Sequence, residues 1–341
     1  MVTGICLVAL GTQCSIMAGM SLEQEIKDRA LELGCDAVGI TDATPIAEAD
    51  IERLRTWLDA GAAGEMAYLR RNFDKRIHPA ALLEGAQSVV VIALNYKPAE
   101  EPACTAHPTS ADGPSGTVAT YACYEDYHDF MRPLLHELAD FIRARTDNAQ
   151  RFKVCVDSVP LAERALAVRA GLGFIGKNHM LIHLKLGPQV FLGELVTTAK
   201  LHPDEPTPGT CVGCDRCLRA CPTGALSADG QFDARRCLSY LTIEYQGAVP
   251  SELAATVGDR IFGCDECVRV CPYRQTAPER ANRRFRFHPE RARLDLSRIL
   301  AMDLEGFATE FTGSPIARTG HETLQRNARI CLANTQRDRK S

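Results

Sequence analysis

Hydrophobic and polar positions between residues 21 and 200 follow two patterns, which together predict an α/β domain. Apolar residues at helical spacing predict helices over 22–33, 47–58, 128–145 and 161–170. Short runs of apolar and β-branched residues predict buried strands at 37–41, 88–94, 152–156 and 190–197. The segment 98–116 is rich in Pro, Ser, Thr and Gly and has no periodicity, so it is expected to be a surface loop.

The amphipathic pattern begins after Met20, where Ser21 can cap the first helix. Residues 1–20 contain a short apolar stretch, but neither a basic segment ahead of it nor an arginine pair, as secretory signals require. We therefore expect a non-native or disordered extension over 1–20, a natural start at Met20 rather than Met1, and a cytoplasmic protein whose thiols stay reduced.

Composition narrows the class of protein. The chain has 341 residues, 45% hydrophobic and 24% charged, with a formal net charge of −4, which suits a folded chain with a sizeable core. No apolar run reaches the roughly 18 residues of a membrane span, so an integral membrane protein is excluded. The 15 cysteines are unusual, and eight of them fall within 211–271. A reduced, long chain with clustered cysteines favours metal binding over disulfides.

The cysteine segment starts with the spacing C-x2-C-x2-C-x3-C-P, formed by Cys211, Cys214, Cys217 and Cys221 before Pro222. This is the bacterial ferredoxin spacing, in which three thiolates hold one [4Fe-4S] cluster and the fourth binds a second cluster.

A second half, C-x2-C-x3-C-P, lacks one cysteine of the full repeat, and Cys237 is the obvious replacement. Crossed ligation then assigns the eight residues to two clusters of four: Cys211, Cys214, Cys217 and Cys271, and Cys221, Cys237, Cys264 and Cys267. Structural zinc is the competing interpretation, but a zinc ion needs only four ligands and has no use for the additional cysteines.

Asp157 follows a predicted strand and precedes a predicted helix. In open α/β sheets the ligand crevice lies beyond the carboxyl ends of the strands, which makes Asp157 a candidate site residue. The alternative is that Asp157 caps the following helix.

Motifs around these features resemble the epoxyqueuosine reductase family from about residue 21 to about residue 334. They are GEMAYL (64–69), Arg76, VDSVPLAER (156–164), RAGLGFIGKN (169–178), FLGEL (191–195), CPTGA (221–225), RCLSYLT (236–242), GDRIFGCD (258–265), GSPIAR (313–318) and Arg326-Asn327. The resemblance implies an iron-sulfur and cobalamin enzyme that reduces epoxyqueuosine at the wobble position of tRNA to queuosine, the last step of queuosine synthesis.

The same resemblance implies an α/β (α+β) cobalamin-binding catalytic domain over 21–200 and a ferredoxin-like domain with two [4Fe-4S] clusters over 201–280. An Arg-rich, helical C-terminal segment over 281–341 is expected to pack back on the core. Asp157 is the implied catalytic acid, and the implied cofactor contacts are Arg76, Asp157, Lys177, Asn178, Ser239, Cys264 and Asp265. Asp126 and His128 begin a D-x-H-x-x-G motif, but Met131 replaces its glycine, so an axial histidine is not expected on cobalt.

Opening an epoxide and releasing its oxygen as water takes two electrons and two protons. To donate a proton near pH 7, Asp157 would need a pKa about 3 units above its ordinary value of about 3.9, a shift that burial against a corrin face could produce.

Binding of tRNA requires local positive charge. Nine arginines against three acidic residues in 269–298 provide it: Arg269, Arg274, Arg280, Arg283, Arg284, Arg286, Arg291, Arg293 and Arg298. The alternative is an ordinary solvated helical surface.

Two other functions fit the cysteine pattern. One is a two-cluster electron-transfer protein without cobalamin, and the other is a reductive dehalogenase, a family normally exported behind a twin-arginine signal that this chain lacks. For the reductase we expect a monomer that takes electrons from a donor of ferredoxin or flavodoxin type and has no membrane partner.

Overall fold

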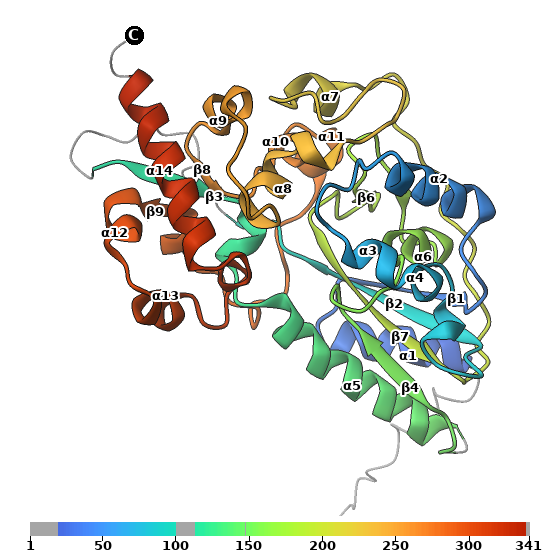
Figure 1. Ribbon diagram of the computed structural model, residues 1–341. Helices are drawn as coiled ribbons and strands as arrows, with labels where there is room; N and C mark the ends of the chain where they lie inside the picture. The colour runs from blue at the N-terminus through green and yellow to red at the C-terminus, as the bar shows by residue number, and fades with distance from the viewer. Residues whose placement is uncertain (1–19, 100–112, 147, 339–341) are drawn as a thin grey trace, which may run out of the picture.

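The computed structural model describes residues 20–99, 113–146 and 148–338 (Figure 1). The expected extension over 1–20 lies outside these residues except for Met20. A four-stranded sheet in the order β1-β2-β7-β4 forms the centre of the N-terminal half. Its strands are β1 (Ala37–Asp42), β2 (Ser88–Asn95), β7 (Val190–Thr197) and β4 (Phe152–Cys155).

Helices cover both faces of this sheet, which explains why β2 reads as a continuous apolar run. Alternate side chains of a strand point to opposite faces. Val90 and Ile92 pack with α1 (Leu22–Glu32) and α5 (Tyr127–Arg145), whereas Val89 and Val91 pack on the opposite face. The helices near that second face are α2 (Glu48–Asp59), α3 (Tyr68–Arg71), α4 (Phe73–Ile77) and α6 (Glu163–Arg169).

The predicted helices and strands of this half are confirmed to within a few residues, and Ser21 caps α1 by accepting the Gln24 N–H. The topology corrects one expectation. All three strand pairings of the central sheet are antiparallel, so the crevice rule for open parallel sheets does not apply to Asp157. The architecture is α+β, and Asp157 is placed by a different route, described below.

A second sheet joins distant parts of the chain. The strand β3 (Ser115–Val118) pairs in parallel with β8 (Arg260–Phe262) and antiparallel with β9 (Arg293–Asp295). The end of the expected loop 98–116 is therefore strand, while residues 100–112 lie outside the described part. One apolar cluster unites this sheet with the C-terminal helices, including Val118, Phe262, Leu294 and Leu324.

The C-terminal half consists of short elements around the cysteine segment and a long final helix (Figure 1). The short helices are α7 (Arg216–Ala220), α8 (Leu238–Ile243), α9 (Ser251–Val257), α10 (Glu266–Arg269), α11 (Pro272–Thr276), α12 (Leu296–Ala301) and α13 (Leu304–Phe311). The final helix α14 (His321–Asp338) contacts α8, α9, α12 and β8. A hairpin of β5 (Phe174–Ile175) and β6 (Leu181–Ile182) lies beside the cysteine segment.

Single-turn 3-10 helices connect several of these elements. They are η1 (Pro79–Ala81), η2 (Thr120–Cys123), η3 (Ala234–Arg236), η4 (Pro289–Ala292) and η5 (Pro315–Thr319). Within the described part of the chain, every helix is too short or too polar to cross a bilayer.

Candidate active site

The two cysteine motifs fold into similar turns that each lead into a short helix. Cys217 lies in α7 and Cys267 in α10, and these two helices pack against each other. Pro272 opens α11 directly after Cys271, a position where the missing N–H of proline costs no helical hydrogen bond. The motifs thus bring two sets of thiols to one helix–helix contact.

One set contains four thiols. Burial raises the pKa of Cys217, and the neighbouring Cys211 and Cys214 add to this effect. Burial likewise raises the pKa of Cys271, again with contributions from Cys211 and Cys214. Cys271 therefore lies with the first motif although it belongs to the second.

The other set contains the remaining four. Burial raises the pKa of Cys237, and nearby Cys221 contributes. Burial also raises the pKa of Cys264 to about 11, and Cys237 is among its neighbours. Cys267 has its pKa raised by burial and then by Cys264 and Cys237. Cys217 of the first set also acts electrostatically on Cys267, in keeping with the contact between α7 and α10, and the assignment of the eight thiols to two clusters stays a prediction.

Two further observations bear on these sets. Among the described residues, no three His, Cys, Asp or Glu side chains converge closely enough to hold a single metal ion. A four-iron cluster is a larger group than one zinc ion, so its thiolates stand farther apart.

The first set borders the surface, where Val212 is 82% exposed, and it packs against Phe174 and Ile182 of the hairpin.

Asp157 lies in the loop between β4 and α6, in the left-handed region at φ 49°. It does not cap α6, because the residue before that helix is Ala162 and no side chain caps it. Instead the Asp157 N–H donates to Oε1 of Glu163 at 2.6 Å. The expectation of a capping role is therefore wrong, and Glu163 determines how the loop is held.

The Asp157 carboxylate is ion-paired. Its Oδ2 lies 3.2 Å from Nη1 of Arg318 and 3.3 Å from Nε2 of His128. Partial burial raises the pKa of Asp157, but the hydrogen bond with His128 and the charges of His128 and Arg318 outweigh it and lower this pKa to about 2. The raised pKa expected from the sequence is not what these contacts produce.

His128 connects Asp157 to a second carboxylate. Its Nδ1 lies 2.6 Å from Oδ1 of Asp126, while Nε2 also lies 3.0 Å from Nη1 of Arg318. Burial lowers the pKa of His128, but the hydrogen bonds to Asp126 and Asp157 raise it by more. A protonated His128 donates from Nε2 to Asp157, whereas a neutral one accepts there from Arg318. The ring nitrogen can thus alternate between two partners.

Side chains from several elements lie around Asp157, and together they form what we call the Asp157 site. Burial raises the pKa of Tyr68 in α3 to about 12, and Glu244, Asp157, Arg76 and Arg318 all act on it. Burial lowers the pKa of Arg76 in α4. The nearby groups of Tyr68, Glu163 and Asp157 raise this pKa, but by less. The Nε of Arg76 is buried without a hydrogen-bond partner among the described residues.

Aromatic side chains also belong to the Asp157 site. Tyr68 is 41% exposed, and the ring of Tyr127 stacks on Phe191 with centroids 4.3 Å apart. Burial raises the pKa of Tyr127, and Asp157 is its largest electrostatic neighbour. Flat rings together with an unpartnered buried donor suit a planar macrocycle with amide side chains. The residues present therefore fit a corrinoid.

The other predicted contacts occupy different places. Asn178 is buried and donates from Nδ2 to the Cys267 carbonyl at 3.3 Å, whereas Lys177 is exposed. The Asp265 carboxylate accepts the Thr120 N–H at 2.6 Å. The Ser239 backbone N–H donates to Cys237 and lowers the pKa of that thiol, although burial raises it more. These residues surround the second cysteine set.

Sequence reasoning gave no role to Arg318, Glu163 or Glu194. Each lies in a motif that carries the family resemblance. Glu163 is 6 residues from Asp157, so its contact is local, whereas Arg318 and Glu194 reach Asp157 and Glu163 from other segments of the chain. No spacing rule could have predicted these two contacts between separate segments.

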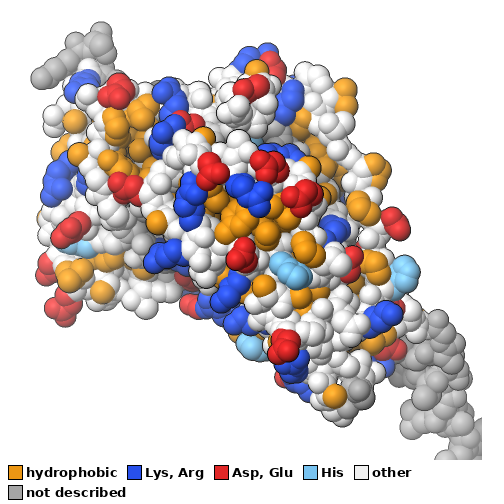
Figure 2. Space-filling model, turned by 45° about the vertical axis from the view of Figure 1, so that its right-hand side comes forward, with side chains coloured by type: hydrophobic (Ala, Val, Ile, Leu, Met, Phe, Trp, Pro, Cys, Tyr) orange, Lys and Arg blue, Asp and Glu red, His pale blue; other side chains and the backbone are white. Residues whose placement is uncertain are grey.

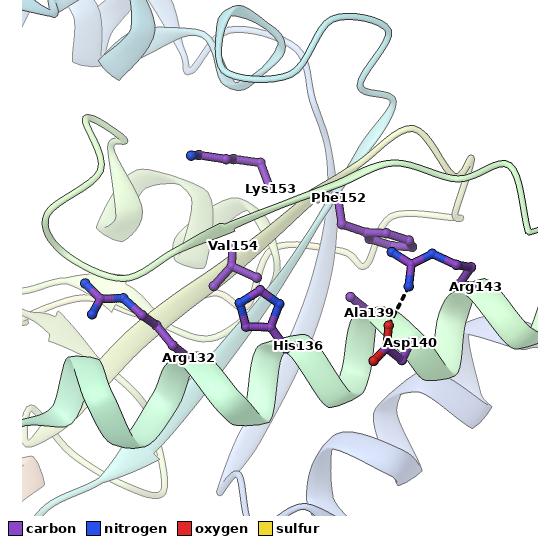
Figure 3. Close-up of a pocket in the computed structure, with 8 residues that line it drawn as sticks. All are labelled: Arg132, His136, Ala139, Asp140, Arg143, Phe152, Lys153 and Val154. Carbon is purple, nitrogen blue, oxygen red and sulfur yellow. Dashed lines mark hydrogen bonds and ion pairs between the residues drawn. The ribbon is translucent and has the colours of Figure 1, made fainter.

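A basic cavity of about 400 Å³ lies beside the Asp157 loop, between α5 and β4 (Figure 3). Arg132 and Lys153 belong to its lining, and Arg132 also donates to the Ser158 hydroxyl at 3.4 Å. The rest of the lining is His136, Ala139, Asp140, Arg143, Phe152 and Val154. An excess of cationic side chains suits a phosphate group better than a corrin ring.

The nine arginines of 269–298 divide into two groups. Most bind the chain itself: Arg298 pairs with Glu310, Arg293 with Asp259, and Arg280 donates to backbone carbonyls. Exposed members remain at Arg283, Arg284 and Arg286. On the face shown in Figure 2, cationic and acidic side chains are interspersed, so the positive charge forms no continuous stripe there.

Comparison with known proteins finds two family models. Residues 210–274 match the 4Fe-4S double cluster binding domain, and residues 76–158 match the family described as epoxyqueuosine reductase QueG, DUF1730. An epoxyqueuosine reductase from Vibrio cholerae is 38% identical over 313 residues, which cover 92% of this chain and 83% of the relative.

Solved structures of epoxyqueuosine reductases are similar to this chain over most of its length. An epoxyqueuosine reductase in complex with an epoxyqueuosine-modified tRNA-Tyr stem loop superposes with a TM-score of 0.84 at 33% identity, over 92% of this chain and 81% of that one. A second, from Bacillus subtilis, has a TM-score of 0.82 at 33% identity over the same shares of the two chains. That structure is described with its catalytic aspartate loop swung out of the active site.

Proposed function

The chain belongs to the epoxyqueuosine reductase family, and we propose that its Asp157 site reduces the epoxide of epoxyqueuosine in tRNA to the alkene of queuosine. One observation carries the site assignment: the fold that holds two sets of four cysteines also brings Asp157, Arg318 and His128 together. Membership in this family favours the reductase over the two alternative functions, a simple electron carrier and a reductive dehalogenase.

The reaction balances with two electrons and two protons. Both C–O bonds of the epoxide break, the carbons become an alkene, and the oxygen leaves as water. The protein must therefore deliver electrons to the ring carbons and protons to the oxygen. Its cofactors are two [4Fe-4S] clusters and cobalamin.

The clusters suit an electron path from the surface inward. The set of Cys211, Cys214, Cys217 and Cys271 borders the surface, which suits the entry of electrons from a ferredoxin or flavodoxin type donor. The second set neighbours Asp265, which acts electrostatically on Tyr121, a partly buried residue on which Asp157 also acts. Arg76, Tyr68 and Tyr127 would hold cobalamin, which supplies a reduced cobalt centre, a strong nucleophile and reductant for an epoxide.

Proton delivery is assigned to Asp157 and His128. Asp157 is ionised in the free enzyme because Arg318 and His128 lower its pKa. We assign His128, held by Asp126, to protonate Asp157 through the 3.3 Å contact at Oδ2 once the substrate draws Arg318 away. Asp157 then donates to the epoxide oxygen. His128 is a proton donor here and not a cobalt ligand.

Two basic surfaces would bind the tRNA backbone. One is the cavity between α5 and β4, which adjoins the Asp157 loop through Arg132. The other contains Arg283, Arg284 and Arg286, and the Arg286 N–H donates to Glu125, the residue before Asp126. Both lie next to the residues that surround Asp157, as a substrate loop that reaches Asp157 requires.

The test of the function is mass spectrometry of tRNA nucleosides from a strain that lacks this protein. We expect epoxyqueuosine to accumulate and queuosine to disappear. Normal queuosine without epoxyqueuosine would overturn the proposal. The cobalamin content of the purified protein separates the enzyme from a simple electron carrier, and its solution mass tests the expected monomer.

A further inference from the structure

A pair of acidic side chains lies behind the Asp157 loop, where the reaction has no evident use for it. Glu194 is in the middle of β7, with Val91 of β2 opposite it on one side and Cys155 of β4 on the other. Its side chain is completely buried. A carboxyl group at such a position has to be neutral, or paired with a donor, because an isolated buried charge is strongly disfavoured.

The partner of Glu194 is another carboxyl group. No N–H or hydroxyl group of the described residues donates to either oxygen of Glu194. Alternation along β7 points Glu194 to the same face as Leu192 and Val196, which pack on α6. There Glu194 reaches the carboxyl group of Glu163, the first residue of α6, and a hydrogen bond between two carboxyl groups can join them. Such a bond exists only when at least one of the two groups is protonated.

Glu163 also reaches the active-site loop. Its Oε1 accepts the Asp157 backbone N–H at 2.6 Å. Asp157 needs such support, since it occupies the left-handed region at φ 49°, which residues other than glycine disfavour. Three groups thus form one chain, from the Glu194 carboxyl through Glu163 to the Asp157 backbone.

We propose that Glu194 keeps its proton and donates it in a hydrogen bond to Glu163, so that Glu163 clamps the Asp157 N–H and holds the catalytic loop in place. Glu163 and Glu194 are positioning residues in this scheme, because neither touches the reacting atoms. The inference rests on the proposed role of Asp157. It adds a buried acid pair that sets the position of that residue.

Burial and the charged groups around Glu163 and Glu194 determine the pH at which each of the two carboxyl groups ionises. Burial raises the pKa of Glu163 to about 7, with Asp157 adding to the shift, and burial raises the pKa of Glu194 well above its ordinary value. The other titratable groups that act on the pair are Arg164, Arg76, Tyr127 and Cys155. Glu163 therefore ionises near neutral pH while Glu194 keeps its proton. The new charge lies beside the ionised Asp157 carboxylate, whose repulsion outweighs the hydrogen bond from the Asp157 N–H, so the clamp weakens.

Hydrogen exchange tests the clamp without any substrate. Backbone exchange of the peptide containing Asp157 is measured on the intact, cofactor-loaded protein between about pH 6 and about pH 9, after correction for intrinsic exchange. Wild type should lose protection as the pH rises through about 7. Glu163→Gln keeps an acceptor that cannot ionise, so its protection should be independent of pH. Glu163→Ala has no acceptor, so its protection should be lost throughout.

Single-turnover rates on an epoxyqueuosine-modified stem loop give the second measurement. Glu163→Ala should lower the rate about tenfold, and Glu163→Gln should restore most of it. Glu194→Gln keeps the side-chain volume and a hydrogen-bond donor, so its single-turnover rate should remain close to that of wild type. This variant is used because larger changes at a buried position can prevent folding. Glu84→Gln, an exposed glutamate, is the matched control.

Two results would overturn the proposal: a Glu163→Gln protein with the pH-dependent protection of wild type, or one as slow and unprotected as Glu163→Ala. If Asp157→Asn remains fully active, the proposed role of Asp157 fails, yet the exchange results still decide whether the clamp exists.

Discussion

The guanidinium of Arg318 lies 3.2 Å from the Asp157 carboxylate, although 161 residues separate the two in sequence. The loop that follows α13 thereby reaches the loop that follows β4. This contact, together with His128, keeps the predicted catalytic acid ionised before the substrate arrives. Binding of an anionic tRNA offers Arg318 a competing partner, and a catalytic cycle can then release Asp157 for protonation.

Replacing Arg318 by Met should raise the pKa of Asp157. At about pH 4, a carboxyl near the ordinary 3.8 is partly protonated, whereas one at about 2 is almost fully ionised. Infrared difference spectra, with the Asp157→Asn protein to identify the band, measure this fraction. Arg132→Met is the control, because Arg132 contacts the Ser158 hydroxyl and not the Asp157 carboxylate. An identical titration in Arg318→Met and wild type would contradict the assigned cause.

Asp157→Asn should keep both clusters and cobalamin but lose turnover by about 10²- to 10⁴-fold, the range expected when a general acid is removed. Iron analysis and the cobalamin absorption spectrum check the loading, and single-turnover reduction of a modified stem loop gives the rate. The exposed Asp129→Asn in α5 serves as the matched change. Full activity in Asp157→Asn would remove this residue from the catalytic role.

Cysteine substitutions test the crossed ligation. Cys271→Ala and Cys214→Ala should disturb the same cluster, and Cys267→Ala the other one, so iron content should fall towards about four atoms in each variant. Electron paramagnetic resonance of the reduced proteins identifies which signal is lost. Cys331→Ala, at a completely buried cysteine outside both sets, should retain all the iron. Matching spectra for Cys271→Ala and Cys267→Ala would reject the crossed scheme.

Arg286→Ala should weaken binding of the tRNA stem loop and reduce the dependence of log affinity on log salt by about one contact, because the Arg286 side chain is exposed and its backbone N–H contacts Glu125, the residue before Asp126. Arg298→Ala should have little effect, since Arg298 is paired with Glu310. Fluorescence anisotropy at several salt concentrations measures both. Equal losses in the two variants would mean that only overall charge matters.

The buried acid pair should make stability depend on pH. Glu163 has a folded pKa of about 7 against an ordinary 4.5, so the unfolded chain ionises first as the pH rises. Stability is then highest below about 4.5 and falls as the pH rises towards 7. The Tm of wild type should fall more than that of Glu163→Gln across this range. A parallel decline in the two proteins would assign the effect to other groups.

Much of this molecule could be predicted from local patterns. Apolar spacing identified the helices and strands of the N-terminal half, because a secondary structure repeats with a period that the chain itself carries. Cysteine spacing predicted the two ligand sets for a similar reason: a cluster accepts thiolates only from turns of particular length. The strand at Ser115–Val118 was missed because its short sequence carries little signal, and its partners lie more than 140 residues away.

The sequence by itself determined which residues are chemically able to act: eight thiols at cluster spacing, an aspartate after a strand, and an arginine-rich segment. Only the tertiary structure decided their states. It made the sheet antiparallel, used several of the arginines to hold the chain together, and placed Arg318 and His128 on Asp157. It also buried Glu194 against Glu163. The physical reason is that charge, protonation and strain depend on neighbours in space, and folding brings those neighbours from distant parts of the chain.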